Sequence, residues 1–321
     1  MLGAPAGGVG RSGHHPSDPA NVRPTRPPKP GYPFVVPLSP STTAHPNPAV
    51  WKAEPMHVEP LNTAIGARIT DVDLRDLDDA GFAALIDALT EHLVVFLPGQ
   101  QLTDPDQLAL VKRFGGDYVH PLARAAGVTE STVGHIVDDE EHPPFQDQWH
   151  TDVSWDPAPP TWGILRAVEM PERGGDTLFA STYAAYDALS PTMQEMLEGL
   201  VAFHDMGRAT AFKSKGGEEM TRKAAELVPG AEHPVVRVHP VTGRKYLYVN
   251  RGFTNRIVGL HPEESDALLE LLYRHCEKPE FQVRYEWTEG DVAIWDERPT
   301  LHYAVADHYP RRREMARTNA A

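Results

Sequence analysis

The chain of 321 residues holds 30 Lys and Arg against 45 Asp and Glu, which gives a formal net charge of −15. This charge repels phosphate backbones, and because no Lys/Arg cluster in the body of the chain is long enough to offset it, nucleic acid is excluded as a partner. Hydrophobic residues make up 40% of the sequence and charged residues 23%, as in globular proteins with a sizeable core.

Membrane insertion and secretion are not indicated by the sequence. No apolar run approaches the roughly 20 residues that cross a bilayer, and the first residues lack the basic-then-apolar order of a secretory signal. The single cysteine, Cys276, cannot form an internal disulfide, and it ends a stretch with the pattern of an amphipathic helix. We therefore expect a cytoplasmic protein without a membrane partner, in which Cys276 is a packing residue rather than a reactive thiol.

The first 50 residues differ in composition from the rest of the chain. They hold 12 of the 31 prolines, together with many Gly, Ser and Thr and little periodic apolar pattern. Such a segment cannot bury enough apolar surface to offset the entropy lost on ordering. The sequence predicts a flexible, proline-rich tail over residues 1–50 and one folded domain over residues 51–321.

The folded part begins with strands and helices in alternation. Apolar residues recur at spacings of three and four where a helix is expected, and they run continuously where a buried strand is expected. In chain order we expect a strand at Ile65–Ile69, a helix at Asp78–Leu93, a buried strand at Val94–Leu97 and a helix at Asp104–Phe114.

Short strands and longer helices are mixed in the remainder of the chain. Strands are predicted at Gly163–Val168, Thr177–Ala180, Val235–Val238, Tyr246–Val249, Phe281–Trp287 and Asp291–Trp295. Helices are predicted at Thr182–Leu200, Glu218–Leu227 and Ser265–Cys276. Many short strands with helices at irregular intervals favour a mainly β fold with flanking helices over a regular βαβ array.

The sharpest local feature is Trp149-His-Thr-Asp152. On an extended segment His150 and Asp152 point to the same side, so two ligands from one rigid strand end can bind a metal ion. The pattern alone is weak, because a histidine hydrogen-bonded to a nearby carboxylate is the commoner outcome. His302 supplies a third candidate, and it follows the strand-like Val292–Trp295 and a turn, so that we expect it at the end of a strand.

Two histidines and one carboxylate form the facial triad of non-haem Fe(II) oxygenases, which leaves three positions on the ion open. A zinc hydrolase uses the same residue types with water at the open position. His150, Asp152 and His302 alone therefore do not identify the metal.

Two arginines near the C-terminus bear on this choice. If Arg313–Arg317 is a strand, residues 313, 315 and 317 share one face, and two guanidinium groups point toward the same cavity. If the iron site binds 2-oxoglutarate, the carboxylate that does not chelate iron needs a cation beside it. Arginine is the best residue for this. The alternative, a solvated basic run, is our interpretation for Arg311 and Arg312.

The order His150-x-Asp152, Thr177, His302 and Arg313 resembles the signature of the taurine dioxygenase family of 2-oxoglutarate-dependent enzymes. The resemblance runs from about Glu54 to Thr318, through the stretches Trp149–Val153, His233–Pro240, Lys278–Val283 and Asp291–Asp296. It implies a double-stranded β-helix, or jelly roll, with Fe(II) bound by the triad, and it assigns Thr177 and Arg313 to the 2-oxoglutarate carboxylate.

The implied enzyme consumes 2-oxoglutarate and O₂, releases succinate and CO₂, and hydroxylates an unactivated C–H bond of a second substrate. Asp152 is typical of hydroxylation, because related halogenases leave that position open for chloride. Relatives commonly form dimers or tetramers, so we expect a homo-oligomer.

Substrate residues also carry over from the resemblance. His120 and Arg317 match positions that hold the sulfonate of taurine, Phe253 matches an apolar wall, and Gln146 stands where the family has an Asn. Because Ala123 replaces a Tyr of that family, the pocket is not expected to fit taurine itself. We expect a small anionic substrate, namely a sulfonate, an alkyl sulfate or a carboxylate.

Several alternatives stay open at this point. His120 is also consistent with a structural histidine near a helix end, and residues 204–217 resemble a mobile lid only loosely. The whole protein is also consistent with a zinc-dependent hydrolase or a non-catalytic ligand-binding jelly roll. Asp152, Thr177 and Arg313 discriminate against both classes, because neither needs a 2-oxoglutarate site.

Overall fold

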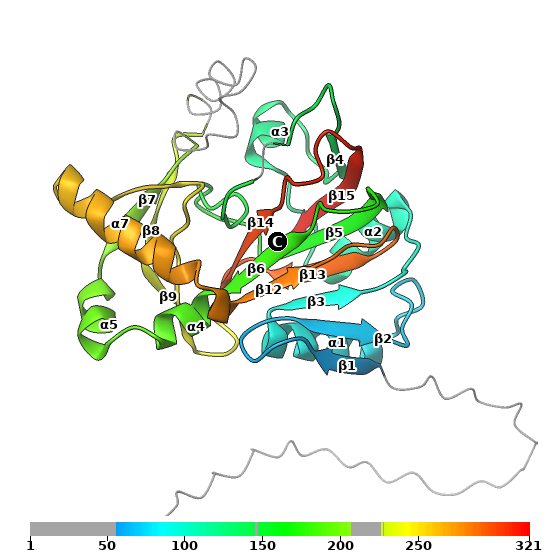
Figure 1. Ribbon diagram of the computed structural model, residues 1–321, viewed down its shortest axis with the longest axis horizontal. Helices are drawn as coiled ribbons and strands as arrows, with labels where there is room; N and C mark the ends of the chain where they lie inside the picture. Colours follow the sequence, from blue (N-terminus) through cyan, green and yellow to red (C-terminus); the bar gives the residue numbers. More distant parts are fainter. Residues whose placement is uncertain (1–55, 145–146, 207–225, 227) are drawn as a thin grey trace, which may run out of the picture. The chain divides into compact units, whose positions relative to one another are not determined.

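A seven-stranded sheet is the largest element of the computed structural model, which describes residues 56–144, 147–206, 226 and 228–321 (Figure 1). All its neighbouring strands are antiparallel except β2 and β3, which are parallel. In sheet order the strands are β1 (His57–Pro60), β2 (Ala67–Thr70), β3 (Val94–Leu97), β13 (Val292–Asp296), β5 (Trp162–Glu169), β15 (Arg313–Ala320) and β4 (Gly134–Asp138). Figure 1 shows them running from β1 at the lower edge to β4 at the upper edge.

A smaller sheet packs on one face of the large one and encloses the main core. Its antiparallel strands are β12 (Gln282–Tyr285), β6 (Thr177–Ser181) and β14 (Thr300–Ala304), in that order. Alternate residues of the large sheet, such as Phe96 and Trp295, point into this core, where Phe179 of β6 contacts both rings. Two facing sheets, antiparallel except for the pairing of β2 with β3, build the jelly roll.

The opposite face of the large sheet is covered by α1 (Asp79–His92) and α2 (Asp104–Arg113). Val95 and Ile294, the neighbours of the inward-facing residues, pack against Leu89 of α1. Both helices begin at a side chain that accepts a backbone N–H: Asp78 from Gly81 and Thr103 from Asp106. Both helices were predicted from the spacing of their apolar residues, and the caps fix the residues at which they begin.

The remaining elements form a second helical and β layer against the outer face of the small sheet. The helices are α4 (Thr182–Asp187), α5 (Pro191–Leu197), α7 (Pro262–Cys276) and the 3₁₀ helix η2 (Pro279–Phe281). Two small sheets complete this part, one of β11 (Thr254–Ile257), β7 (Val201–His204) and β8 (Ala231–Pro234), the other of β10 (Lys245–Leu247) and β9 (Val236–Val238). The short helix α3 (Pro121–Ala125) lies apart from them, near β4 (Figure 1).

The mainly β fold with flanking helices is confirmed, and two predicted elements need comment. The single helix Thr182–Leu200 is wrong, because α4 ends at Asp187 and Ser190 caps a new helix that starts at Pro191. The helix Glu218–Leu227 lies outside the described residues apart from Glu226, as does the tail over residues 1–50.

Cys276 is buried at the end of α7, where burial raises the pKa of its thiol to about 12. Among the described residues no helix is long and apolar enough to span a membrane.

Candidate active site

Three buried side chains converge beside the small sheet. His302 is the third residue of β14, and its backbone exchanges two hydrogen bonds with that of His150, of 2.8 and 3.0 Å. Asp152 Oδ1 lies 3.5 Å from Nε2 of His150 and 3.5 Å from Nε2 of His302. One ligand atom from each of the three residues lies within 4.8 Å of the others. The structure therefore brings the predicted triad together.

The local structure of the triad differs from the sequence expectation. His302 lies inside β14 and not at the end of a strand, and His150 forms only an isolated bridge, after which Asp152 begins a turn. The cross-strand bridge, rather than alternation along one strand, is what places the two imidazoles side by side, with ring centroids 4.1 Å apart.

Both imidazoles are in the form that binds a metal ion. The Nδ1–H of His150 donates to the carbonyl of Gln148 at 2.8 Å, which leaves the Nε2 lone pair toward Asp152. Burial lowers the pKa of His302 to about 3, and burial followed by the neighbouring His302 lowers the pKa of His150 well below its usual value. Two neutral imidazoles and one carboxylate, all buried, fit Fe(II) with open coordination positions.

The second oxygen of Asp152 is held by the C-terminal strand. Oδ2 accepts a hydrogen bond from Asn319 Nδ2 at 3.1 Å and pairs with the guanidinium of Arg317. The Asp152 N–H donates to Oε2 of Glu297 at 3.1 Å, and Asn319 also donates to Oε1 of that residue at 3.4 Å. Glu297 is fully buried, which raises the pKa of its carboxyl well above the usual range. These contacts leave Oδ1 as the oxygen that faces the imidazoles.

The turn that follows Asp152 has a strained backbone. Val153 has a φ of 50°, a conformation that β-branched residues seldom adopt. The residue is held there by packing against Tyr118, Trp155 and Met206, and its carbonyl accepts the N–H of Asp156 at 2.8 Å. Strain of this kind collects at functional sites because the surroundings over-determine the geometry.

A pocket beside His302 ends at Thr177 and Arg313. Arg313 is 3% exposed, and its Nε donates to the carbonyl of Gly175 at 2.9 Å. Thr177 Oγ1 accepts from Trp287 Nε1 at 3.0 Å, so its own hydrogen is available to donate into the pocket. Burial lowers the pKa of Arg313, but a guanidinium stays charged at pH 7. A cation and a hydroxyl donor thus face the same small space, as a carboxylate requires.

A second cavity, of about 400 Å³, lies on the other side of Arg317 and is lined by His120 and Ala123. Arg317 lines both cavities, and burial lowers its pKa to about 10. His120 Nδ1 accepts the N–H of Leu122 at 3.3 Å at the start of α3, so in the neutral ring Nε2 carries the hydrogen. The protein around the ring, and then the charge of Arg317, lower the pKa of His120 to about 4. His120 is therefore a neutral hydrogen-bond donor at pH 7.

The other predicted substrate residues are less well placed. The Phe253 ring lies 6.0 Å from that of His150, nearly perpendicular to it, but Phe253 does not line the 400 Å³ cavity. Gln146 and residues 207–217 of the expected lid lie outside the described residues.

The family description "Taurine catabolism dioxygenase TauD, TfdA family" matches residues 57–319. The chain belongs to this family. It is 37% identical to an alpha-ketoglutarate-dependent sulfate ester dioxygenase of Pseudomonas putida, over 83% of the chain and 89% of that protein. Identity to an alkylsulfatase of Acinetobacter baylyi is 36%, over 83% of the chain and 85% of the relative. A taurine dioxygenase from Burkholderia xenovorans, solved by crystallography, has a TM-score of 0.69 at 35% identity, covering 83% of the chain and 91% of that structure.

Membership of the TauD/TfdA family settles the class of enzyme. The chain is a 2-oxoglutarate-dependent dioxygenase of jelly-roll fold that uses Fe(II) and O₂, as the sequence predicted. The two alternative classes, a zinc hydrolase and a non-catalytic jelly roll, are set aside.

Sequence reasoning missed two residues that contact Asp152. Asn319 continues the alternation of residues 313, 315 and 317, so extending the same argument by one step along the strand would have found it. Glu297 had no such signal, because its contact depends on how the loop before β14 folds back under Asp152. Arg317 itself is held by the pairing of β15 with β5, which continues as far as Ala320.

Proposed function

We propose that the site is divided into three groups of residues with separate tasks. The Fe(II) ligands are His150, Asp152 and His302. The groups that bind the distal carboxylate of 2-oxoglutarate are Thr177 and Arg313. The residues proposed for the substrate are His120, Arg317, Phe253 and Gln146.

The observation that carries this proposal is the position of His302 relative to Arg313. Both line one pocket, so a molecule that reaches from the metal position toward a buried cation fits between them. Iron and 2-oxoglutarate, when bound, supply the oxidising power for attack on a substrate C–H bond. The chain's own groups do the rest: Arg313 and Thr177 orient the carboxylate, and apolar walls such as Phe179 and Trp295 limit access of water.

Arg317 connects this division to the substrate. Its guanidinium contacts Asp152 and also borders the 400 Å³ cavity that His120 lines. A substrate anion placed there would receive a charged donor from Arg317 and a neutral N–H from His120. Its carbon chain would then extend along the side of the cavity where Ala123 and Val128 lie.

An alkyl sulfate ester is the substrate class that we propose. Two relatives of 36 and 37% identity are an alkylsulfatase and a sulfate ester dioxygenase, and Ala123 leaves room for an alkyl chain. Hydroxylation at the carbon that bears the sulfate would give an unstable adduct, which separates into an aldehyde and inorganic sulfate. The corresponding sulfonate would release an aldehyde and sulfite.

The direct test is anaerobic addition of Fe(II) and 2-oxoglutarate to the protein. We expect the visible charge-transfer band of an iron chelate of the keto acid. Tight binding of Zn(II) with no such band would contradict the proposal. Substrate-dependent succinate formation, measured with alkyl sulfates, sulfonates and carboxylates, then identifies the substrate class, and the substitution Ala123→Tyr should affect long alkyl chains more than short ones.

We also propose a setting for the enzyme. A flexible tail over residues 1–50 would precede a dioxygenase domain over residues 51–321, and limited proteolysis should cleave within the tail first. Cytoplasmic location is supported by the dependence of the enzyme on 2-oxoglutarate, an intracellular metabolite. A homo-oligomer, dimer or tetramer, follows from the family resemblance, and light scattering of the purified protein tests it.

A further inference from the structure

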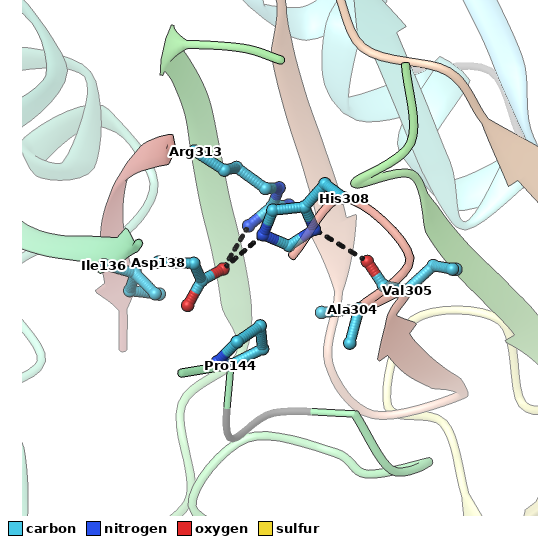
Figure 2. Close-up of a pocket in the computed structure, with 8 residues that line it drawn as sticks. Ile136, Asp138, Pro144, Ala304, Val305, His308 and Arg313 are labelled. Carbon is cyan, nitrogen blue, oxygen red and sulfur yellow. Dashed lines mark hydrogen bonds and ion pairs between the residues drawn. The ribbon is translucent and has the colours of Figure 1, made fainter. Parts of the chain in front are cut away.

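Behind Arg313 lies a third cavity, a small one lined by Asp138 and His308 (Figure 2). These side chains are almost fully buried, with 5% of Asp138 and 1% of His308 exposed. One oxygen of Asp138, Oδ2, lies 3.3 Å from His308 Nε2 and 3.7 Å from Arg313 Nη1. Figure 2 shows both contacts converging on that oxygen. Neither Asp138 nor His308 belongs to the groups proposed above for metal, co-substrate or substrate.

The fold brings these side chains together from separate segments. Asp138 and Arg313 are directly opposite each other in the pairing of β4 with β15, and His308 comes from the turn between β14 and β15. Gly175 closes the third side: it has a φ of +78°, and a Cβ atom there would lie 2.8 Å from Arg313 Cδ. Only glycine allows the backbone to approach so closely and offer its carbonyl to Arg313 Nε.

Two edges of the Arg313 guanidinium are thus occupied by the protein itself. Nε donates to Gly175, and Nη1 faces Asp138, which leaves the other N–H groups to the pocket with Thr177 and His302. His308 is itself held, because its Nδ1–H donates to the carbonyl of Val305 at 3.3 Å. Nε2 then lies 3.3 Å from Asp138 Oδ2 as an ion-pair contact and not a hydrogen bond, and it carries a hydrogen only when the ring is charged.

We propose that Asp138 and His308 are positioning residues for 2-oxoglutarate: they hold Arg313 in the orientation in which it receives the distal carboxylate. The inference rests on the proposed role of Arg313. A long arginine side chain loses much rotamer freedom when it binds a carboxylate, and partners that fix it beforehand remove that cost from the binding step. The charge of Asp138 attracts the guanidinium, and the buried His308 ring lies against Asp138 on the other side.

The chain contains a second, more exposed set of the same residue types, made of Asp139, His142 and Arg312. Asp139 Oδ1 contacts His142 Nδ1 at 2.8 Å, and Asp139 Oδ2 lies 3.5 Å from Arg312 Nη1. These side chains are 27%, 65% and 42% exposed, respectively. The outer set has the same chemistry as the inner set but does not line the co-substrate pocket, so it provides controls.

The experiment is an anaerobic titration of 2-oxoglutarate into the Fe(II) enzyme, followed through the absorbance of the chelate. Asp138→Ala should raise the Kd for 2-oxoglutarate by about ten- to a hundredfold, the same range as for loss of a residue that orients a metal ligand. Asp138→Asn should give a Kd between those of the wild type and Asp138→Ala, because it keeps the size of the side chain and an oxygen beside Arg313 but loses the charge that attracts Nη1. Fe(II) affinity and the KM for the primary substrate should not change, and neither should any property of Asp139→Ala.

Three results would overturn the inference. An unchanged Kd in Asp138→Ala means that the pair does not position Arg313. If the Kd for 2-oxoglutarate falls by the same factor in Asp138→Ala and Asp138→Asn, then Asp138 only competes with the co-substrate for the charge of Arg313. If Asp139→Ala raises the Kd for 2-oxoglutarate as much as Asp138→Ala does, the effect does not depend on the position of Asp138 beside Arg313. A wild type without a chelate band would contradict the proposed function itself, which distinguishes the two failures.

A second pair of variants covers the case in which Asp138→Ala does not fold. His308→Gln puts an amide group beside Asp138, whereas His308→Leu leaves no polar atom there. We expect the Kd for 2-oxoglutarate to rise in the Leu variant and to be largely restored in the Gln variant. Equal affinity in both would overturn the role of His308.

Discussion

The two ends of the site are built in different ways. The co-substrate end is made of side chains on regular strands, Thr177 on β6, His302 on β14 and Arg313 on β15, all at most 6% exposed. The substrate end depends on His120, at the start of the five-residue helix α3, and on the exposed loop that contains Val128. Chemistry shared by a family belongs on the rigid scaffold, whereas specificity can change where loops form the wall.

This contrast predicts that substitutions at the co-substrate end affect every substrate equally, while those at the other end separate one substrate from another. The following predictions test that division, from the largest expected effect to the smallest.

Asp152→Ala should reduce succinate formation to background with any substrate. The change removes one of three proposed ligands and the partner of Arg317 and Asn319. The assay is succinate release with saturating 2-oxoglutarate, together with Fe(II) binding by the same variant. Asp187→Asn, an exposed residue paired with Arg244, is the control and should retain full activity. Substantial succinate formation by Asp152→Ala would contradict the ligand assignment.

Arg313→Gln should raise the KM for 2-oxoglutarate at least about thirtyfold, because loss of one partner of a buried charge pair costs about 2 to 5 kcal/mol. The KM for the primary substrate should change little. Steady-state kinetics with each substrate varied in turn measures both values. Arg312→Gln changes the same residue type at the surface and should have no effect on either. If both variants behave alike, the buried position of Arg313 does not matter.

Arg317→Gln should raise the KM for the primary substrate about ten- to a hundredfold, as expected for loss of one charged hydrogen bond. The KM for 2-oxoglutarate should rise at most about threefold. The two KM values, measured on the same preparation, give the ratio. Because Arg317 also contacts Asp152, a fall in kcat is expected alongside. An equal rise in both KM values would contradict the separate roles proposed for Arg317 and Arg313.

Acid should destabilise the fold through its buried histidines. Burial lowers the pKa of His204 to about 3 and lowers the pKa of His233 as well, whereas an unfolded histidine titrates near 6.5. Between these values the unfolded chain binds more protons, so the free energy of unfolding falls as the pH drops below about 6.5. Each such histidine contributes up to about 1.4 kcal/mol per pH unit. Urea unfolding of the metal-free protein at pH 7, 6 and 5 measures this, and a constant free energy would contradict the buried, neutral state.

Sequence reasoning recovered the parts of the molecule that local patterns encode. The spacing of apolar residues in α1 and α2 and the continuous apolar run of β3 were visible in short windows. The triad was found through the order and spacing of His150, Asp152 and His302, supported by a family resemblance. The helix and strand patterns lie within a few residues of sequence, and the triad was recognised because its order matches that of the family.

The missing parts depend on contacts between distant segments. Strand β4 was not predicted, although its pairing with β15 joins Asp138 to Arg313, 175 positions later (313 − 138). The contact of Glu297 with Asp152 likewise depends on tertiary packing. Inside Thr182–Leu200 the apolar pattern continued across Ser190-Pro191, and only the cap and the proline marked the break. Such positions carry no local signal for the partner that they will contact.

The most direct test of the account is the stoichiometry of turnover with an alkyl sulfate. Under limiting 2-oxoglutarate, the enzyme with Fe(II) and O₂ should release succinate and inorganic sulfate in a one-to-one ratio. Arg317→Gln should lose this sulfate release at substrate concentrations that saturate the wild type. Sulfate release without 2-oxoglutarate, or succinate formation that no anionic substrate stimulates, would contradict an oxidative enzyme whose chemistry and specificity lie at separate ends of one site.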